Sequence, residues 1–551
     1  KKAKEMKSQF LRTMIIIGLF GSSNLLSAWN VLYSSATSPG KGNCQNICRN
    51  ISDTGSLTAS VWIENGASPI VSMIRFLEVD DNGDIIKQNV VKLQFPMGST
   101  AVKRIEIHRL LINQDSLSYI LFGTAHNPNP NFPSIRSFLM KVDVMLNVVQ
   151  VQFLDEFFDY YDFTITPVTG QFVCVGTIGI YDRLKAPSRR AVITTLSSNF
   201  TCQGFNLLPQ SFPTAGNISR FDNIKVVKAY RDDINNSEFL FIAGHITRSK
   251  ISGSDTFYYP QLFVSKVNIG SSGGMVHQWY SNIDTKTIGL LELDEVTPCD
   301  LIYDKARNQI AIINSSENKG TAGFLRAHLL ILESMNGNPI IFHTYEGPGT
   351  VSNQISVHTV FGQTIQMKSN GKYCVNGWAD NIVFNGVLYG RYNFYQVDYD
   401  PQISDFDSMK LVVGLSNGYL SSQPRDFYGI FTDTGYNSGF GFDSLGVYYT
   451  PHSMIVYQDS NGQDQEVVVW MGTDLNNNNH VMRIWSTKYG QGGEGVVCEG
   501  SKLKVHQNAF LFDVVHKFID WQYVACTEFS PGFANPHNND FDQKACDGSF
   551  N

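Results

Sequence analysis

Eight side chains at loop positions of the sequence are the best suited to binding a ligand. They combine aromatic rings, imidazoles, a guanidinium and carboxylates, which can stack on and hydrogen-bond to a sugar or a peptide. Loops on a rigid scaffold commonly carry such sites. The residues are His126, Arg248, Trp378, Asp380, Tyr428, Phe431, Asp474 and His480. For each one taken singly, an ordinary surface position is the competing interpretation.

Three segments match catalytic or cofactor motifs in residue type and spacing, but the sequence around them does not support that chemistry. Gly414–Gly418 reads G-x-S-x-G without the helix that a nucleophile elbow needs. Gly490–Gly495 reads G-x-G-x-x-G outside any βαβ unit. The carboxylates of Asp155–Asp162 could serve glycoside hydrolysis, and a crossover with a solvated acidic face is the favoured alternative. We therefore predict no catalytic residue and no cofactor.

Nine cysteines fit an oxidising compartment but are too few for a disulfide scaffold of this length. Cys44 and Cys48 could close a small loop, and Cys526 could join Cys546 in the C-terminal tail. An odd count leaves one thiol unpaired. Because no second Cys/His pair lies near Cys44 and Cys48, we predict no metal site.

The first 28 residues have the three-part layout of a secretory signal peptide. Basic residues follow Met6, an apolar stretch covers Met14–Phe20, and a small-residue segment ends at Ala28. Lys1–Glu5 are then upstream sequence, and a buried helix or membrane anchor is the alternative. The apolar stretch is too short to span a bilayer. We expect a secreted or cell-surface chain with no transmembrane span.

Bulk composition describes a folded chain that is not a nucleic-acid binder. Of the 551 residues, 42% are hydrophobic and 17% are charged, which allows a large core. The net charge is −7, and no basic stripe is present. Nucleic acid is therefore not expected as a partner.

Pairs of apolar runs recur seven times along the chain, with a period of roughly 65 residues. In six of the seven pairs the first run ends in a small residue, Gly or Asn, that we interpret as a turn former. The first runs are Leu57–Trp62, Tyr119–Gly123, Phe172–Gly176, Phe239–Gly244, Ile310–Asn314, Tyr373–Gly377 and Val467–Gly472. The second runs are Met73–Val79, Phe138–Val142, Ala191–Leu196, Leu262–Val267, Leu329–Leu332, Phe394–Val397 and Val481–Trp485.

Further apolar runs before and after each pair complete four strands per unit, joined by turns rich in Asn, Gly and Asp. Helical periodicity is almost nowhere sustained. We predict an all-β, seven-bladed β-propeller, with six or eight blades as alternatives. Residues 29–50 would form a lead-in and 51–500 the propeller. Residues 501–551 would supply a closing strand or begin a further module.

Apart from one crossover between units, the long connections of this arrangement fall between the second and third strands of a unit. In an antiparallel meander these connections share one end with the crossovers between units, and the tight turns share the other. Long irregular loops are predicted at 124–135, 177–189, 245–259, 317–325 and 379–390, and the crossover 414–446 is longest. One end is therefore elaborated and is the expected ligand-binding end.

Runs such as Phe138–Asp143 and Leu262–Asn268, each following an apolar run that ends in glycine, resemble the repeats of secreted bacterial β-propellers. They are similar to the kelch-like repeats of Bacteroidota surface proteins. The resemblance covers residues 50–500 and implies fold more than function, because such propellers serve in binding, adhesion and catalysis.

Three functions remain open at this point. The leading hypothesis is a secreted, non-enzymatic propeller that binds a carbohydrate or protein partner at the cell surface. The second is a polysaccharide-active hydrolase or lyase, which predicts carboxylates or a histidine converging near the axis. The third is a structural role in an extracellular assembly, through edge or tail contacts. The oligomeric state is not predicted.

Overall fold

In the computed structural model, all regular elements of the described residues are β-strands joined by turns, and none is an α-helix. The all-β prediction is therefore confirmed for this part of the chain. The structure describes residues 29–34, 40–64, 72–81, 83–95, 102, 104–114, 117–126, 135–154, 158–178, 190–207, 222–252, 255–269, 275–283, 296–318, 324–346, 355–356, 359–380, 382–384, 387–389, 393–406, 409–412, 454–459, 461–473, 480–488, 501–503, 506–509, 514–516, 522–524, 530–537 and 542–545.

Seven antiparallel meanders of four strands follow one another along the chain. The predicted apolar runs become strands because β-branched and aromatic residues fit the pleated, half-buried surface of a sheet. The first three meanders are β2 (Gly40–Arg49), β3 (Gly55–Glu64), β4 (Ser72–Asp80) and β5 (Ile85–Gln94); β6 (Arg104–Asn113), β7 (Ser118–His126), β8 (Ile135–Val142) and β9 (Val148–Phe153); and β10 (Phe158–Ile165), β11 (Phe172–Ile178), β12 (Arg190–Leu196) and β13 (Cys202–Leu207).

The fourth to sixth meanders repeat this order. They are β14 (Asn223–Asp232), β15 (Ser237–Ser252), β16 (Asp255–Ile269) and β17 (Met275–Ile283); β18 (Val296–Asp304), β19 (Gln309–Asn318), β20 (Phe324–Glu333) and β21 (Pro339–Glu346); and β23 (Thr359–Met367), β24 (Tyr373–Asp380), β27 (Asn393–Asp400) and β29 (Met409–Val412), with β28 (Asp405–Phe406) beside β27. The connection predicted as a loop at 379–390 instead contains β25 (Ile382–Phe384) and β26 (Val387–Tyr389), which form a small sheet with β22 (Ile355–Ser356).

The seventh meander is assembled from the two ends of the repeat region. Its first three strands are β30 (Met454–Gln458), β31 (Asp464–Thr473) and β32 (His480–Lys488), and its fourth is β1 (Trp29–Ser34). Trp29 pairs with Ser486 and Tyr33 with Met482 in an antiparallel register. The N-terminal lead-in therefore contributes the strand that completes the last meander.

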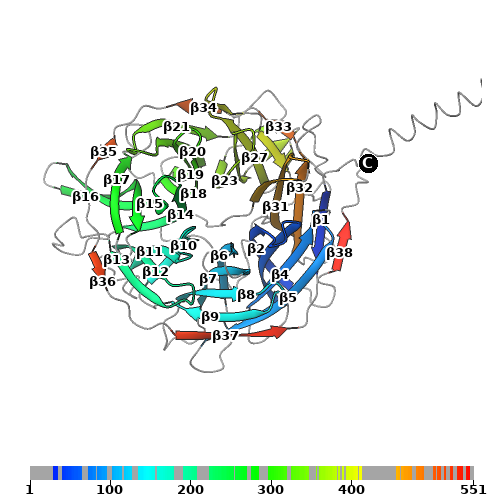
Figure 1. Ribbon diagram of the computed structural model, residues 1–551. Helices are drawn as coiled ribbons and strands as arrows, with labels where there is room; N and C mark the ends of the chain where they lie inside the picture. The colour runs from blue at the N-terminus through cyan, green and yellow to red at the C-terminus, as the bar shows by residue number, and fades with distance from the viewer. Residues whose placement is uncertain are drawn as a thin grey trace, which may run out of the picture.

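The seven meanders lie around a common centre, as Figure 1 shows. Their first strands are innermost, and each contacts the first strand of the next meander, with β30 contacting both β23 and β2. Apolar clusters fill the spaces between neighbouring meanders, for example Phe138 and Phe76 between the first two, and Ile331 and Tyr399 between the fifth and sixth. The core is thus divided among the inter-sheet layers, where each sheet buries both faces.

A β-bulge interrupts the innermost strand at the same place in six meanders. The unpaired residues fall between Cys44 and Asn46, Ile107 and Arg109, Tyr160 and Asp162, Ile224 and Val226, Pro298 and Asp300, and Gly362 and Thr364. Gly123, Gly176 and Gly244, which end three of the predicted first runs, lie opposite these bulges, inside the strands. Their interpretation as turn formers is wrong, since a Cβ on Gly176 would lie 2.0 Å from the carbonyl oxygen of Asp159. The recurring glycine marks a close backbone approach.

The C-terminal segment runs around the outside of the ring and adds a short strand to every meander. In Figure 1 these strands lie on the periphery. β33 (Ser501–Leu503), β34 (His506–Ala509), β35 (Val514–His516) and β36 (Gln522–Val524) pair with β29, β21, β17 and β13. β37 (Ser530–His537) joins β9 to β5, and β38 (Asp542–Ala545) pairs with β1. We call residues 501–545 the C-terminal belt; it covers the outer edge strands, which would otherwise present unpaired backbone groups.

Candidate functional site

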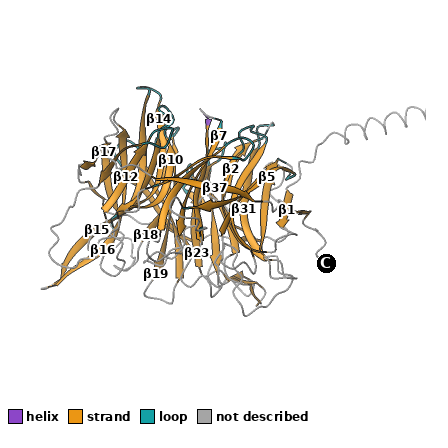
Figure 2. Ribbon diagram, turned by 90° about the horizontal axis from the view of Figure 1, so that it is seen from below, coloured by secondary structure: helices purple, strands orange, loops and turns teal. Residues whose placement is uncertain are grey.

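The two ends of the meanders differ in the way that the sequence predicted. Tight turns join first to second strands, as at 166–171 and 459–463. The longer connections, such as 127–134 and 179–189, join second to third strands at the opposite end. Figure 2 shows the short turns on one side of the molecule and the tip of the β15–β16 hairpin on the other. The strand bounds therefore confirm which end carries the short turns, whereas residues 127–134 and 179–189 of the long connections lie outside the described part of the chain.

The predicted ligand-binding residues that the structure describes share the elaborated end but lie on separate sheets. His126 ends β7, Arg248 lies in β15, Trp378 and Asp380 lie at the end of β24, and His480 begins β32. They therefore come from the second, fourth, sixth and seventh meanders. Tyr428, Phe431 and Asp474 lie outside the described residues.

The most pronounced feature of this end is a ribbon made by β15 and β16. The sequence predicted an irregular loop at 245–259, but the two strands continue in register until Ser252 meets Asp255. That prediction is wrong because β15 and β16 keep pairing with each other through their backbones beyond the rest of the sheet. Strand β14 pairs with β15 only as far as His245, and β17 pairs with β16 only as far as Leu262. The ribbon beyond these points has no third strand among the described pairings.

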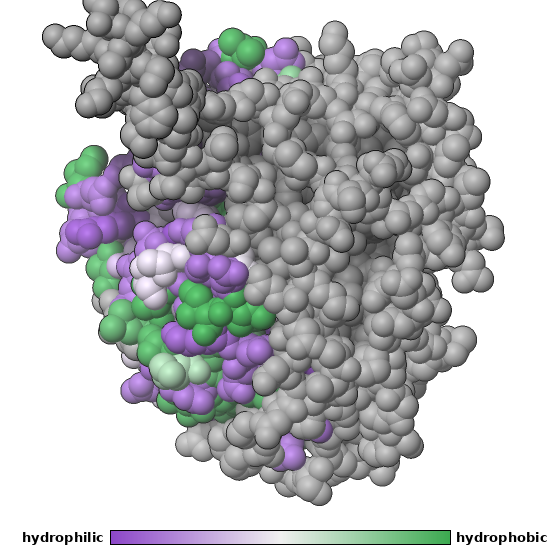
Figure 3. Space-filling view, turned by 90° about the vertical axis from the view of Figure 1, so that its right-hand side faces the viewer, coloured by the Kyte–Doolittle hydropathy of each residue, from purple (hydrophilic) through white to green (hydrophobic). Residues whose placement is uncertain are grey.

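Register places cationic and aromatic residues on one face of the ribbon. Arg248 lies opposite Tyr259, and Lys250 lies opposite Phe257. Directly opposed residues of an antiparallel pair share a face, as do alternate residues along a strand. We call these four residues the ribbon face. On the described surface that Figure 3 shows, on another side of the molecule, hydrophilic and hydrophobic residues are closely interspersed. Of the predicted ligand-binding residues, only Arg248 belongs to this face.

At the centre of the ring, the bulged residues of neighbouring meanders come together. The Nζ atom of Lys225 lies 3.5 Å from the centre of the Tyr161 ring, a cation–π contact between the fourth and third meanders. His108 Nε2 lies 2.7 Å from Thr124 Oγ1 within the second meander. Burial raises the pKa of the Cys299 thiol to about 12, so this thiol is neutral and a poor nucleophile.

Two carboxylates next to the bulges are fully engaged in structural contacts. Asp162 accepts hydrogen bonds from Arg109, and the Oδ1 atom of Asp300 lies 3.0 Å from Nζ of Lys228. Both carboxylates also accept backbone N–H groups of the next meander. Burial, followed by the nearby Arg109, lowers the pKa of Lys228. Because cations and amides already hold them, Asp162 and Asp300 are not arranged as the acid and base of a hydrolase.

The disulfide status of the described cysteines differs from the prediction. Cys48 is buried and not disulfide-bonded, so the predicted Cys44–Cys48 disulfide is absent, and Cys174, Cys299 and Cys374 are not disulfide-bonded either. Cys48 lies in the apolar cluster between the first two meanders, where its thiol acts as a small apolar group. Cys202 of β13 is disulfide-bonded. Cys526 and Cys546 lie outside the described residues.

Comparison with known proteins gives only distant structural similarity. No protein-family model matches the chain, and no curated protein matches it. The phage phi92 endosialidase has 8% sequence identity and a TM-score of 0.35, over 85% of this chain and 70% of that one. A protein of unknown function from Dyadobacter fermentans has 9% identity and a TM-score of 0.27, over 61% of this chain and 96% of that one. An ACO/RPE65 chimera has 10% identity and a TM-score of 0.28, over 55% of this chain and 60% of that one.

Similarity at this level carries no conclusion about function. The chain has the repeated four-stranded sheets that its resemblance to propeller repeats implied. No sequence-family match supports a kelch or Bacteroidota relationship. Within the described residues, no helix is both long enough and apolar enough to cross a bilayer.

Proposed function

We propose that the chain is a closed, seven-bladed β-propeller that acts outside the cytoplasm as a non-enzymatic binding module. Its partner is a protein, which docks on the ribbon face. Support for the propeller comes from the order of contacts between innermost strands and from the completion of the seventh meander by β1. The disulfide at Cys202 supports an oxidising compartment, in agreement with the signal-peptide pattern.

The observation that carries the binding function is the length of the β15–β16 ribbon. A two-stranded ribbon is only marginally stable in water by itself. This one extends by seven residue pairs, from Ile246–Gln261 to Ser252–Asp255, beyond the last pairing with β14 and β17. Arginine and aromatic residues, which its face carries, are enriched in protein interfaces. A partner with an acidic and partly apolar surface would cover the ribbon and match Arg248 and Lys250.

Photo-cross-linking in the native host tests this proposal. Benzoylphenylalanine at position 259 reports on the ribbon face, and the same group at Ile234 serves as the control. Ile234 is 93% exposed and lies in the turn at the other end of the same sheet. We expect one protein to be cross-linked from position 259 and not from position 234. An excess of untagged chain should suppress that product, whereas the Phe257→Ser/Tyr259→Ser chain should not.

A glycan array probed with the same chains separates the alternatives. Saturable glycan binding that the double substitution abolishes would assign the ribbon to carbohydrate and exclude the protein partner. Cleavage of a bound glycan would contradict the non-enzymatic function. Equal cross-linking from both positions would show that the ribbon is not the docking element.

A further inference from the structure

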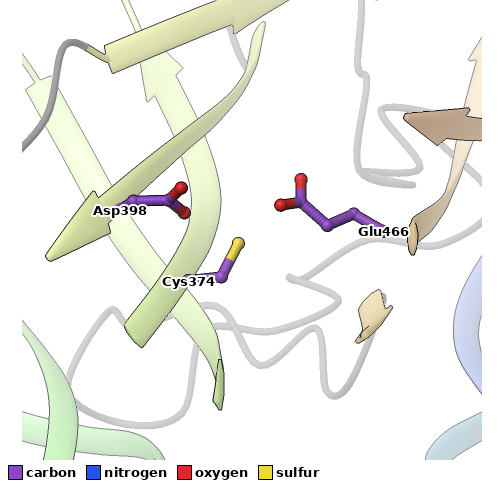
Figure 4. Close-up of side chains that lie close together, drawn as sticks. All are labelled: Cys374, Asp398 and Glu466. Carbon is purple, nitrogen blue, oxygen red and sulfur yellow. The ribbon is translucent and has the colours of Figure 1, made fainter. Parts of the chain in front are cut away.

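A buried cluster of ionisable side chains lies between the sixth and seventh meanders, away from the ribbon. Cys374 of β24 and Asp398 of β27 are directly opposite each other in the register of the sixth meander, and Glu466 belongs to β31 of the seventh. Figure 4 shows the thiol and the two carboxylates pointing into the space between the sheets. All three residues are buried, and one sulfur and one oxygen from each carboxylate lie within 4.8 Å of one another.

Lysine and glutamine side chains complete this cluster. Lys368 Nζ forms ion pairs with Asp398 Oδ2 and Glu466 Oε1. The Nε2 atom of Gln396 donates to Cys374 Sγ at 3.1 Å and to Glu466 Oε2. The Gln396 amide therefore lies between the thiol and the second carboxylate oxygen of Glu466.

Two oxygen atoms in the cluster have no hydrogen-bond partner in the described part of the chain. They are Oδ1 of Asp398 and Oε1 of Gln396, whose residues are 8% and 1% exposed. A buried oxygen without a donor is unfavourable. Turning the Gln396 amide by half a rotation would direct Oε1 toward Cys374 and Glu466, and the two orientations of an amide are nearly isosteric.

The charges of the cluster also favour a bound cation. The Asp398 and Glu466 carboxylates and the Cys374 thiol converge on one buried space, where a charge is stable only when it is paired. A divalent cation bound to the thiolate would supply two positive charges, which together with that of Lys368 match three negative ligands. The thiol proton would leave to solvent as the metal binds.

We propose that Cys374, Asp398 and Glu466 bind a divalent, thiophilic cation, for which Zn²⁺ is the best match. Zinc accepts sulfur and carboxylate oxygen together in a four-coordinate site. The free Asp398 Oδ1 and the Glu466 Oε2 atom would serve as oxygen ligands, and the Gln396 carbonyl oxygen would take the fourth position. Lys368 would stay on the outer carboxylate oxygens and orient both ligands. Such a site would link the sixth meander to the seventh, which is the meander that β1 completes.

Metal analysis of the full chain tests the proposal. After refolding with ZnCl₂ and dialysis, we expect about one zinc per chain by mass spectrometry. Refolding with CoCl₂ should give a near-ultraviolet thiolate-to-cobalt absorption band. This spectrum needs no variant, so a folding defect cannot obscure it. A chain that retains no metal, or binds cobalt without the sulfur band, would overturn the proposal in favour of a proton shared by the two carboxylates.

Substitutions then assign the ligands. Cys374→Ser should abolish the sulfur band, and Glu466→Gln and Asp398→Asn should each weaken zinc binding at least tenfold. Cys174→Ser is the matched control, because Cys174 is also a buried free thiol on a second strand but lies opposite Thr194. The control should keep the metal and the band. Equal zinc affinity of the Cys374→Ser and unmodified chains would refute the assignment.

Discussion

The Nη1 atom of Arg109 lies 2.8 Å from each carboxylate oxygen of Asp162, in the buried space between the second and third meanders. Asp162 Oδ2 also accepts the N–H of Val227 at 2.9 Å, so one carboxylate joins the innermost strands of three consecutive meanders. Asp300 has a similar role further around the ring, where it contacts Lys228 and accepts the N–H of Ile365. These carboxylates fix the relative positions of neighbouring sheets.

Removing the Asp162 carboxylate should strongly destabilise the fold. The Asp162→Ala chain keeps a buried guanidinium without its counter-charge, and loss of one partner of such a pair lowers the free energy of unfolding by about 3–5 kcal/mol. Urea unfolding followed by tryptophan fluorescence measures the change. Asp233→Ala, which removes the exposed ion pair with Lys305, is the control and should change stability little. Equal effects of the two substitutions would contradict the structural role of Asp162.

Adding one methyl group opposite a bulge should also destabilise the protein. A Cβ at position 176 would meet the Asp159 carbonyl oxygen at 2.0 Å, so Gly176→Ala forces the two strands apart. Overpacking of this kind costs about 1–3 kcal/mol. The thermal-unfolding midpoint should fall for Gly176→Ala and change less for Ser60→Ala, since Ser60 lies opposite the bulge of the first meander and already carries a Cβ. An unchanged midpoint for Gly176→Ala would show that the bulge can relax.

Stability should fall under mildly acidic conditions because of His343. Burial lowers the pKa of its imidazole from 6.5, against the opposing influence of Asp405, and neither ring nitrogen has a described hydrogen-bond partner. Below about pH 6.5 the unfolded chain binds a proton that the folded chain does not, so stability falls with pH until the folded pKa is passed. The unfolding midpoint should drop between about pH 7.5 and about pH 5.5. His343→Phe should reduce this drop, and an identical pH profile would exclude His343 as its source.

Removal of the C-terminal belt should expose the rim of the ring to self-association. A chain ending at residue 500 lacks β33 to β38, which leaves the outer strands of the meanders with unpaired backbone groups. We expect larger species in light scattering after size-exclusion chromatography, and faster cleavage by protease. A chain ending at residue 546 keeps all six belt strands and is the control. A monodisperse 1–500 chain with an unchanged unfolding midpoint would show that the belt is dispensable.

Cys202 should be linked to Cys526, so that the belt is covalently attached to the third meander. Belt strand β36 runs antiparallel to β13 with Val524 opposite Phe205; in the sequence, Cys526 is two positions after Val524 and Cys202 is three positions before Phe205. Peptide mapping without reduction should recover this pair of peptides as one species, which the Cys202→Ser chain lacks. A Cys526–Cys546 peptide, as the sequence suggested, would contradict the assignment.

The positions of the strands could be read from the sequence because their causes are local. Alternating apolar residues and Asn-Gly or Asp-rich turns act over a few residues, so β7, β11, β12 and β31 fall where their runs predict. The same local reasoning failed at Gly176, because the close approach that requires glycine comes from a bulge in another strand. It also failed at the ribbon, where two neighbouring strands end before β15 and β16 do.

The sequence by itself determined an all-β chain with a seven-fold repeat and an elaborated end, since propensity, periodicity and turn chemistry are encoded within each unit. Only the tertiary structure decided which residues from different units meet. Cys374 and Glu466 are 92 positions apart, and their proximity depends on how two sheets pack. Five of the six belt strands have only three or four residues, and the belt pairs through backbone groups that nearly every residue carries, so no sequence pattern announces it. Long-range packing and backbone pairing therefore created both the buried cluster of Cys374, Asp398 and Glu466 and the belt.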